Sequence, residues 1–151
     1  MAEVPLVGSP DVGDARPSVL FVCVKNGGKS QMAAALMRSI AGTDVEVHSA
    51  GTKPGGSVNA LSAQVVDEVG ATMEGEVPKG IDQGLFRRVD RVVVLGSEAV
   101  VEAVPGMRGS IETWETDEPS ARGIEGVERM RLIRDDIQVR CEALLEEVKA
   151  L

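Results

Sequence analysis

A continuous apolar run near the N-terminus, Ser18–Cys23 (SVLFVC), constrains the fold of this chain more than any other segment. A run of this length without polar alternation is typical of a strand that is buried on both faces of a parallel sheet. The run ends at Cys23, the pair Gly27 and Gly28 interrupts the pattern, and an Ala/Met/Leu-rich helix is predicted from Ser30 to about Ala41. We therefore expect a buried strand, a tight turn and a helix in direct succession.

The remaining sequence alternates between strand and helix patterns. Apolar runs predict three more strands, at Val45–Ser49, Asp90–Leu95 and Ile111–Trp114. Helical spacing predicts two more helices, at Val58–Val69 and Glu125–Lys149. This order favours an α/β fold, a single-domain parallel four-stranded sheet flanked by helices on both faces. Ligands bind at the carboxyl ends of the strands in such sheets, and the loop after Cys23 is at that place.

Residues 1–17 contain three prolines and two glycines without apolar periodicity. This composition predicts a flexible N-terminal leader before one domain over residues 18–151. No segment has the pattern of a signal peptide or the length of a membrane helix, so we expect a cytoplasmic protein whose thiols stay reduced.

Composition excludes several classes of function. The 16 basic and 24 acidic residues give a net charge of −8, which disfavours binding to nucleic acid or to anionic membranes. Two cysteines, Cys23 and Cys141, are too few for a disulfide scaffold. With His48 as the single histidine, we expect no metal site.

The loop after Cys23 has the chemistry of an anion cradle. Gly27 and Gly28 allow successive backbone N–H groups to point into the loop, and the helix that follows adds the positive end of its dipole. Lys25 and Lys29 add full charges, and the same field favours the thiolate form of Cys23. The expected oxyanion-binding residues are Val24, Lys25, Asn26, Gly27, Gly28 and Lys29.

A plain strand–turn–helix with a buried cysteine and solvated lysines is the structural alternative. A nucleotide-binding Walker loop does not fit, because no glycine lies five residues before Gly28, where the first glycine of that motif belongs. Within the loop, Asn26 is predicted to adopt a left-handed backbone angle. Ser30 is predicted to cap the helix and to donate a hydrogen bond to the Cys23 thiolate.

These segments resemble the low-molecular-weight protein tyrosine phosphatase superfamily, and within it the arsenate reductases. The family loop has Cys, five residues, Arg and Ser, and the reductases continue with Gln-Met-Ala, as residues 31–33 do here. Three further segments match in the expected order, so the resemblance covers nearly all of residues 18–149: His48–Thr52 (HSAGT), Asp90–Leu95 (DRVVVL) and Trp114–Ser120 (WETDEPS).

The resemblance implies a mechanism for arsenate reduction. Cys23 attacks arsenate, Lys29 takes the place of the family's loop arginine, and Glu118 or Asp117, before Pro119, protonates the departing oxygen. The Gly-Gly-Lys-Ser sequence resembles the arsenate reductases that use mycothiol, which implies mycothiol as thiol co-substrate and mycoredoxin as downstream partner. The alternatives are a phosphotyrosine phosphatase of the same superfamily and a non-catalytic oxyanion-binding adaptor.

The other candidate residues receive structural interpretations. Cys141 shares one face of the last predicted helix with apolar residues at spacings of three and four, so we expect it to be packing rather than a resolving cysteine. His48 is expected to be a hydrogen-bonded structural residue rather than a base. Four arginines intermingle with acids on the last helix and are interpreted as a solvated face: Arg129, Arg131, Arg134 and Arg140.

Overall fold

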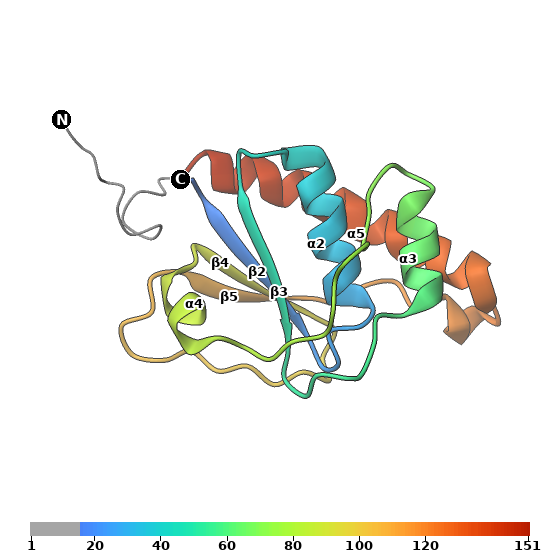
Figure 1. Cartoon of the computed structure of the whole chain (residues 1–151), viewed down its shortest axis with the longest axis horizontal. Coiled ribbons are helices and arrows are strands. Elements are labelled where there is room, and N and C mark those ends of the chain that lie inside the picture. The colour runs from blue at the N-terminus through green and yellow to red at the C-terminus, as the bar shows by residue number, and fades with distance from the viewer. Residues whose placement is uncertain (1–15) are drawn as a thin grey trace.

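A computed structural model describes residues 16–151 of the chain (Figure 1). Most of the predicted leader, residues 1–15, lies outside the described residues. Arg16 and Pro17 contact the domain: Arg16 Nη1 donates to the Thr43 carbonyl at 3.1 Å, and the Glu46 N–H donates to the Pro17 carbonyl at 2.9 Å.

The sheet has four parallel strands, as predicted. In space their order is β3 (Glu46–Gly51), β2 (Ser18–Cys23), β4 (Arg91–Leu95) and β5 (Ser110–Trp114). The central strand β2 is buried along its whole length, because it has a strand on each side and packed layers on both faces. All four strands run the same way, so Cys23, at the end of β2, lies at the edge of the sheet where every strand ends.

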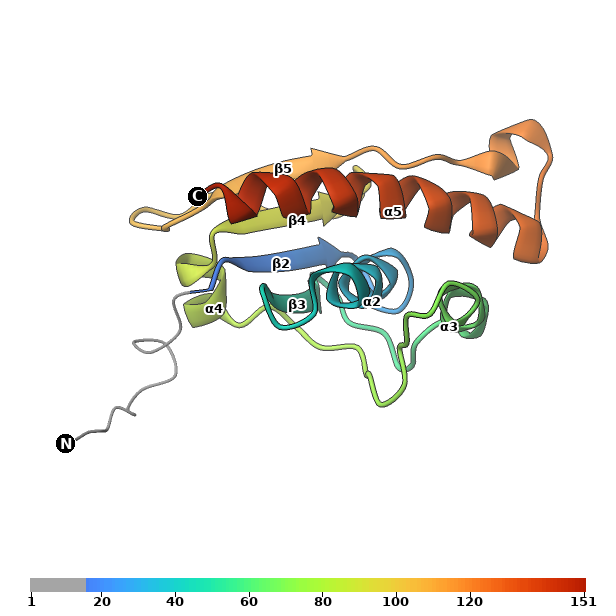
Figure 2. The same ribbon diagram turned by 90° about the horizontal axis from the view of Figure 1, so that it is seen from above.

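Three helices lie on one side of the sheet, two of them over its face and α3 (Ala60–Asp67) packed against those two. The two over the face are α2 (Lys29–Ala41) and α5 (Gly126–Lys149), which also pack against each other. Figure 2 shows α5 running along β4 and β5. The buried face of α5 is the one predicted from the spacing, and it packs with alternate residues of β2 in the larger core: Met130, Ile133, Ile137, Cys141, Leu144 and Val148.

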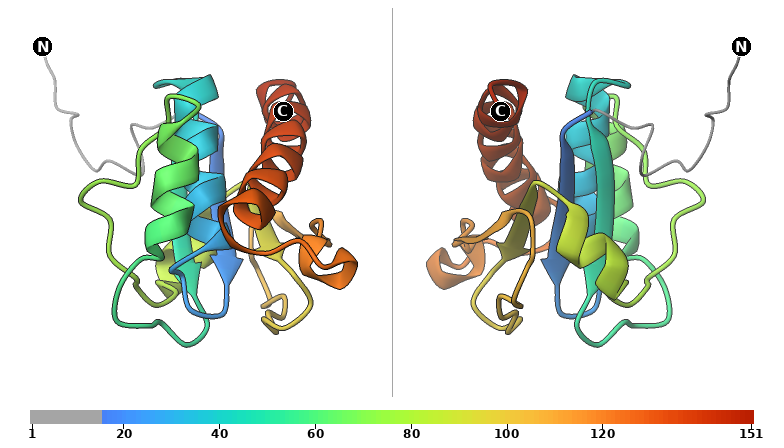
Figure 3. Two further views of the ribbon diagram at one scale, coloured as in Figure 1. Left: turned by 90° about the vertical axis from the view of Figure 1, so that its right-hand side faces the viewer. Right: turned by 90° about the vertical axis from the view of Figure 1, so that its left-hand side faces the viewer.

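The opposite face carries the short helix α4 (Gln83–Arg88), which no sequence pattern predicted (Figure 3). Phe86 of α4 packs with Leu20 and Val22 of β2, which point away from the larger core. The expectation of helices on both faces is therefore confirmed, with one helix of six residues on the second face. Within residues 16–151, no helix is long and apolar enough to cross a bilayer.

Candidate active site

The loop between β2 and α2 is organised around the buried side chain of Asn26. Asn26 has a φ of 54°, the left-handed angle predicted for it. Its Nδ2 donates to Ser30 Oγ at 2.8 Å, while its Oδ1 accepts from the backbone N–H of Lys79 at 3.0 Å and from Gln31 Nε2 at 3.2 Å. These bonds fix the loop to α2 on one side and to residue 79 on the other.

The sulfur of Cys23 lies on the inner side of this loop, and 9% of the residue is exposed. Ser30 Oγ is 2.9 Å from Sγ, and the backbone N–H of Asn26 donates to Sγ at 3.3 Å. Because Ser30 Oγ already accepts from Asn26 Nδ2, its own hydrogen is available for the sulfur. Two polar groups are thus within hydrogen-bond distance of one sulfur.

The helix-cap role predicted for Ser30 is wrong. Helix α2 begins at Lys29, its N-cap residue is Gly28, and no side chain caps it. Ser30 therefore belongs to the first turn of the helix, and its hydroxyl contacts Cys23 and Asn26 instead. The first N–H groups of α2 have no carbonyl of a preceding helical turn to bond with, so the start of the helix is a favourable place for an anion.

The glycines around the loop are needed for close packing. A Cβ on Gly27 would lie 2.9 Å from the Ser57 carbonyl oxygen, and a Cβ on Gly51 would lie 2.6 Å from the Val24 carbonyl oxygen. The positive φ of the loop belongs to Asn26, and neither Gly27 nor Gly28 has one. Gly27 instead has a steric role, whereas Gly28, with φ −125° and ψ −97°, lies outside the helical and extended regions, in line with the expectation of special glycine angles.

Glu118 faces the loop from the other side, from the segment between β5 and the short 3₁₀ helix η1 (Pro119–Arg122). Lys29 Nζ lies 3.1 Å from Glu118 Oε1, and Arg129 Nη2 donates to Glu118 Oε2 at 2.9 Å. The Arg129 guanidinium first, and Lys29 next, hold the pKa of Glu118 below its ordinary value of 4.5. Glu118 is therefore a carboxylate at neutral pH.

Asp117 has a different environment. Both of its carboxylate oxygens accept from Arg122, at 2.8 and 3.1 Å, and its backbone N–H donates to Asp136 Oδ2 at 2.7 Å. The Arg122 guanidinium lowers the pKa of Asp117. Of the two candidate acids, the structure brings Glu118 and not Asp117 to the cavity beside Cys23.

This cavity has a volume of about 520 Å³, within the usual range for small-molecule sites. Its lining combines the nucleophile loop, the end of β4, the segment after β5 and the first turn of α5: Cys23, Val24, Lys25, Lys29, Leu95, Gly96, Ser97, Glu98, Glu115, Thr116, Glu118 and Arg129. Among residues 16–151, no three His, Cys, Asp or Glu side chains are grouped so as to hold a metal ion.

The interpretation of Arg129 as part of a solvated face is wrong, because its guanidinium lines the cavity. Arg134 also departs from that interpretation, since 11% of its side chain is exposed and it bonds to Glu68 and to the Val65 carbonyl. Arg131 and Arg140 are more exposed and form ion pairs with Glu68 and Asp136. Helical spacing predicted the apolar face of α5, but it contained no signal that the first turn of this helix would line the cavity.

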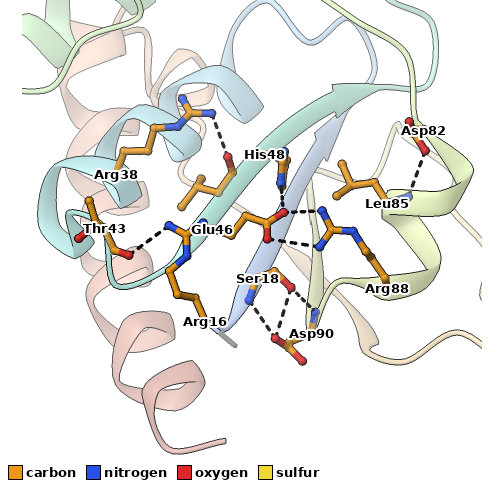
Figure 4. Close-up of polar contacts among 11 residues, drawn as sticks. Arg16, Ser18, Arg38, Thr43, Glu46, His48, Asp82, Leu85, Arg88 and Asp90 are labelled. Carbon is orange, nitrogen blue, oxygen red and sulfur yellow. Dashed lines mark hydrogen bonds and ion pairs between the residues drawn. The ribbon is translucent and has the colours of Figure 1, made fainter. Parts of the chain in front are cut away.

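His48 lies on β3 away from the cavity lining, in the cluster drawn in Figure 4. Its Nε2 pairs with Glu46, and Glu46 also accepts from Arg88 of α4. Glu46 begins β3, whereas Gly51 ends it beside Cys23, so the cluster occupies the opposite edge of the sheet. These contacts agree with a structural, hydrogen-bonded His48.

The family model described as low molecular weight phosphotyrosine protein phosphatase matches residues 18–151. The chain belongs to this family. It is also similar to an arsenate reductase of Staphylococcus aureus, with 29% identity over 129 residues that cover 84% of this chain and 95% of the relative. The family resemblance seen in the sequence is thus confirmed, and the relatives on that branch are named arsenate reductases.

Two solved structures of the family are close in fold. A thioredoxin-dependent arsenate reductase of Corynebacterium glutamicum matches with a TM-score of 0.75 and 30% identity, over 91% of this chain and 64% of that protein. An arsenate reductase of Archaeoglobus fulgidus matches with a TM-score of 0.65 and 25% identity, over 85% of this chain and 98% of that protein.

Proposed function

We propose that this protein is a thiol-dependent arsenate reductase in which Cys23 is the nucleophile and a small external thiol accepts the arsenic. The observation that carries the proposal is the Cys23 sulfur, which accepts from the Asn26 N–H, contacts Ser30 Oγ and borders a cavity that is also lined by Lys25, Lys29 and Arg129. A thiolate beside preorganised cations and N–H groups suits attack on a tetrahedral oxyanion. The names of the similar proteins point to arsenate as that oxyanion.

In the first step, the Cys23 thiolate forms a bond to the arsenic of HAsO₄²⁻ while one As–O bond breaks. The departing oxygen takes a proton from the Glu118 carboxyl and leaves as water. The products are a Cys23–AsO₃²⁻ adduct, water and the Glu118 carboxylate, and arsenic remains As(V). The loop N–H groups, Lys29 and Lys25 hold the oxygens that stay on arsenic.

In the second step, an external thiolate forms a new S–As bond and displaces Cys23 as a thiolate. A second thiol then attacks the sulfur of the released thiol–arsenate, which forms a disulfide and releases arsenite. The two electrons that reduce As(V) to As(III) come from these two thiols. We assign the roles to mycothiol and then mycoredoxin, in the reducing cytoplasm, on the basis of the Gly-Gly-Lys-Ser loop sequence.

The second cysteine supports an external acceptor. Cys141 is fully buried, and its Sγ contacts the Ala33 carbonyl oxygen at 3.6 Å. Burial, with a smaller contribution from Glu142, raises the pKa of the Cys141 thiol to about 12, so it is not a thiolate at neutral pH. The Leu95–Glu98 segment of the cavity lining contains no cysteine that could take the arsenic from Cys23.

The decisive experiment measures arsenate turnover with defined reductants. We expect turnover with mycothiol and mycoredoxin, and none with thioredoxin and its reductase alone. Cys23→Ser should abolish turnover because serine is not ionised near neutral pH. Mass spectrometry after incubation with arsenate and without added thiol should show no Cys23–Cys141 disulfide. Steady turnover with thioredoxin alone, or that disulfide, would overturn the external-thiol mechanism and leave Cys23 as nucleophile.

The proton donor is tested by comparing Glu118→Gln with Asp117→Asn. We expect Glu118→Gln to lower kcat by about 10²–10⁴-fold, the usual contribution of a general acid. Asp117→Asn should change kcat much less, because Asp117 pairs with Arg122 outside the cavity lining. If both variants keep the wild-type kcat, water supplies the proton and neither carboxyl is the acid.

The two alternative functions give different results in the same preparation. A phosphatase would hydrolyse phosphotyrosine through a phosphorylated Cys23, without any thiol. An adaptor would bind arsenate or phosphate and turn over neither. Hydrolysis of phosphotyrosine in the absence of arsenate turnover would favour the phosphatase.

A further inference from the structure

The Glu118 carboxylate engages two of the three cationic side chains that line the cavity. Its Oε1 faces Lys29 Nζ at 3.1 Å, and its Oε2 accepts from Arg129 Nη2 at 2.9 Å and from Ser120 Oγ at 3.2 Å. The third cation, Lys25, lies on the nucleophile loop. Two of the cations that would attract a substrate oxyanion are thus already paired with the Glu118 carboxylate.

Arg129 is an under-used donor in this arrangement. A guanidinium carries five N–H donors in a rigid fork that suits two oxygens of one oxyanion. Among the described residues, its Nε is buried without a hydrogen-bond partner, and a second nitrogen, Nη1, contacts only the weak acceptor Met130 Sδ at 3.6 Å. A buried donor without an acceptor is costly, so a ligand that let the fork reorient toward more acceptors would be favoured.

We propose that Glu118 occupies the oxyanion cations in the free protein, and that the substrate oxyanion displaces it by taking Arg129 and Lys29 as its own ligands. This inference rests on the proposed function and deepens it, since it adds Arg129 as an oxyanion-binding residue. It also couples substrate binding to the protonation of Glu118, which the proposed general acid requires. Once displaced, the Glu118 carboxylate takes a proton from solvent and is ready to protonate the departing oxygen.

The protonation states agree with this sequence of events. In the free protein Arg129 and Lys29 keep the pKa of Glu118 below its ordinary value, so the group is in the wrong form for a general acid. Loss of both cations, together with a dianion nearby, shifts its equilibrium toward the protonated form. The other ionisable groups around the cavity, beyond these two cations, are Cys23, Lys25, Glu98 and Glu115.

The displacement predicts opposite effects of one substitution on binding and on chemistry. Glu118→Gln removes the competing charge, so the affinity for arsenate and for inorganic phosphate should increase by about two- to fivefold, the size of a partly exposed ion pair. The same variant should lose turnover. We expect Arg129→Gln to weaken binding about tenfold through loss of a charge-assisted hydrogen bond, with partial recovery in Arg129→Lys.

Binding is measured by calorimetry at low ionic strength, without any thiol, so that no turnover is required. Asp117→Asn and Arg122→Gln are matched controls, because they remove the neighbouring ion pair outside the cavity lining and should leave affinity unchanged. In the double variant Glu118→Gln/Arg129→Gln, the gain from Glu118→Gln should largely disappear.

Equal or weaker oxyanion binding by a folded Glu118→Gln protein would overturn the displacement, whatever the turnover assays show. Unchanged affinity in Arg129→Gln would remove Arg129 from the oxyanion site. If wild-type protein binds oxyanions as described and reduces no arsenate, the proposed function fails and the displacement stands. If wild-type protein binds neither arsenate nor phosphate, both fail.

Discussion

Ser30 Oγ lies 2.9 Å from the sulfur of Cys23 and at the same time accepts a hydrogen bond from Asn26 Nδ2. The Asn26 amide thus holds the Ser30 hydroxyl beside the sulfur. A residue seven positions along the chain thereby becomes a polar contact of the nucleophile, because α2 starts immediately after the loop.

Ser30→Ala should slow alkylation of Cys23 by iodoacetamide at pH 7 about tenfold, since a hydrogen bond to a charged group contributes about 1.5–3 kcal/mol. Ser62→Ala is the matched control, because Ser62 is also fully buried and its hydroxyl has no hydrogen-bond partner among the described residues. Equal alkylation rates in the two variants would mean that the backbone donors suffice.

Gly51→Ala should displace the nucleophile loop. The added Cβ would lie 2.6 Å from the Val24 carbonyl oxygen and 3.0 Å from the Asn26 nitrogen, both of which are backbone atoms. We expect a loss of about 1–3 kcal/mol in unfolding free energy from overpacking, together with weaker phosphate binding. Gly56→Ala, with no atom within 4 Å of its Cβ, should match wild type in chemical denaturation and in calorimetry.

Cys141→Ala should lower the free energy of unfolding by about 1–3 kcal/mol, because it leaves a small cavity in the core. Arsenate turnover by the folded variant should equal that of wild type. Denaturant titration and a steady-state assay measure the two quantities. A large loss of turnover in a well-folded Cys141→Ala protein would identify Cys141 as a resolving cysteine after all.

Glu68 at the end of α3 should make the protein sensitive to acid. Arg131 first, and Arg134 as well, lower the pKa of Glu68 from 4.5 to about 2 in the folded state. The pKa of Glu68 is thus lower in the folded state than in the unfolded state. The contribution of the Glu68 carboxylate to stability is therefore fully present above about pH 4.5 and disappears as the pH falls toward 2. Glu68→Gln should therefore flatten the dependence of the thermal midpoint on pH in this window. A variant with the wild-type slope would place the acid sensitivity elsewhere.

Local sequence patterns sufficed for the sheet and for the position of the nucleophile loop. Burial along β2 and on one face of α5 follows a pattern that is visible within a few residues of sequence. The turn after Cys23 is likewise marked by adjacent residues. The left-handed angle of Asn26 was predictable for the same reason, since it is a property of one residue type in one turn. Short α4 was missed because six residues that include a glycine carry no clear period.

Packing between distant segments decided the rest. Whether Asp117 or Glu118 lines the cavity beside Cys23 depends on the direction in which the chain leaves β5. Adjacent residues in a loop have no fixed period that would reveal this direction. Arg129 lies 106 positions after Cys23, and only the docking of α5 against α2 brings it to the cavity. The nucleophile is specified by its neighbours in the sequence, whereas the opposing charges are placed by the path of the chain after β5 and by the docking of α5. A sequence pattern therefore reveals contacts between residues that are neighbours in the chain, and it does not reveal contacts between distant segments.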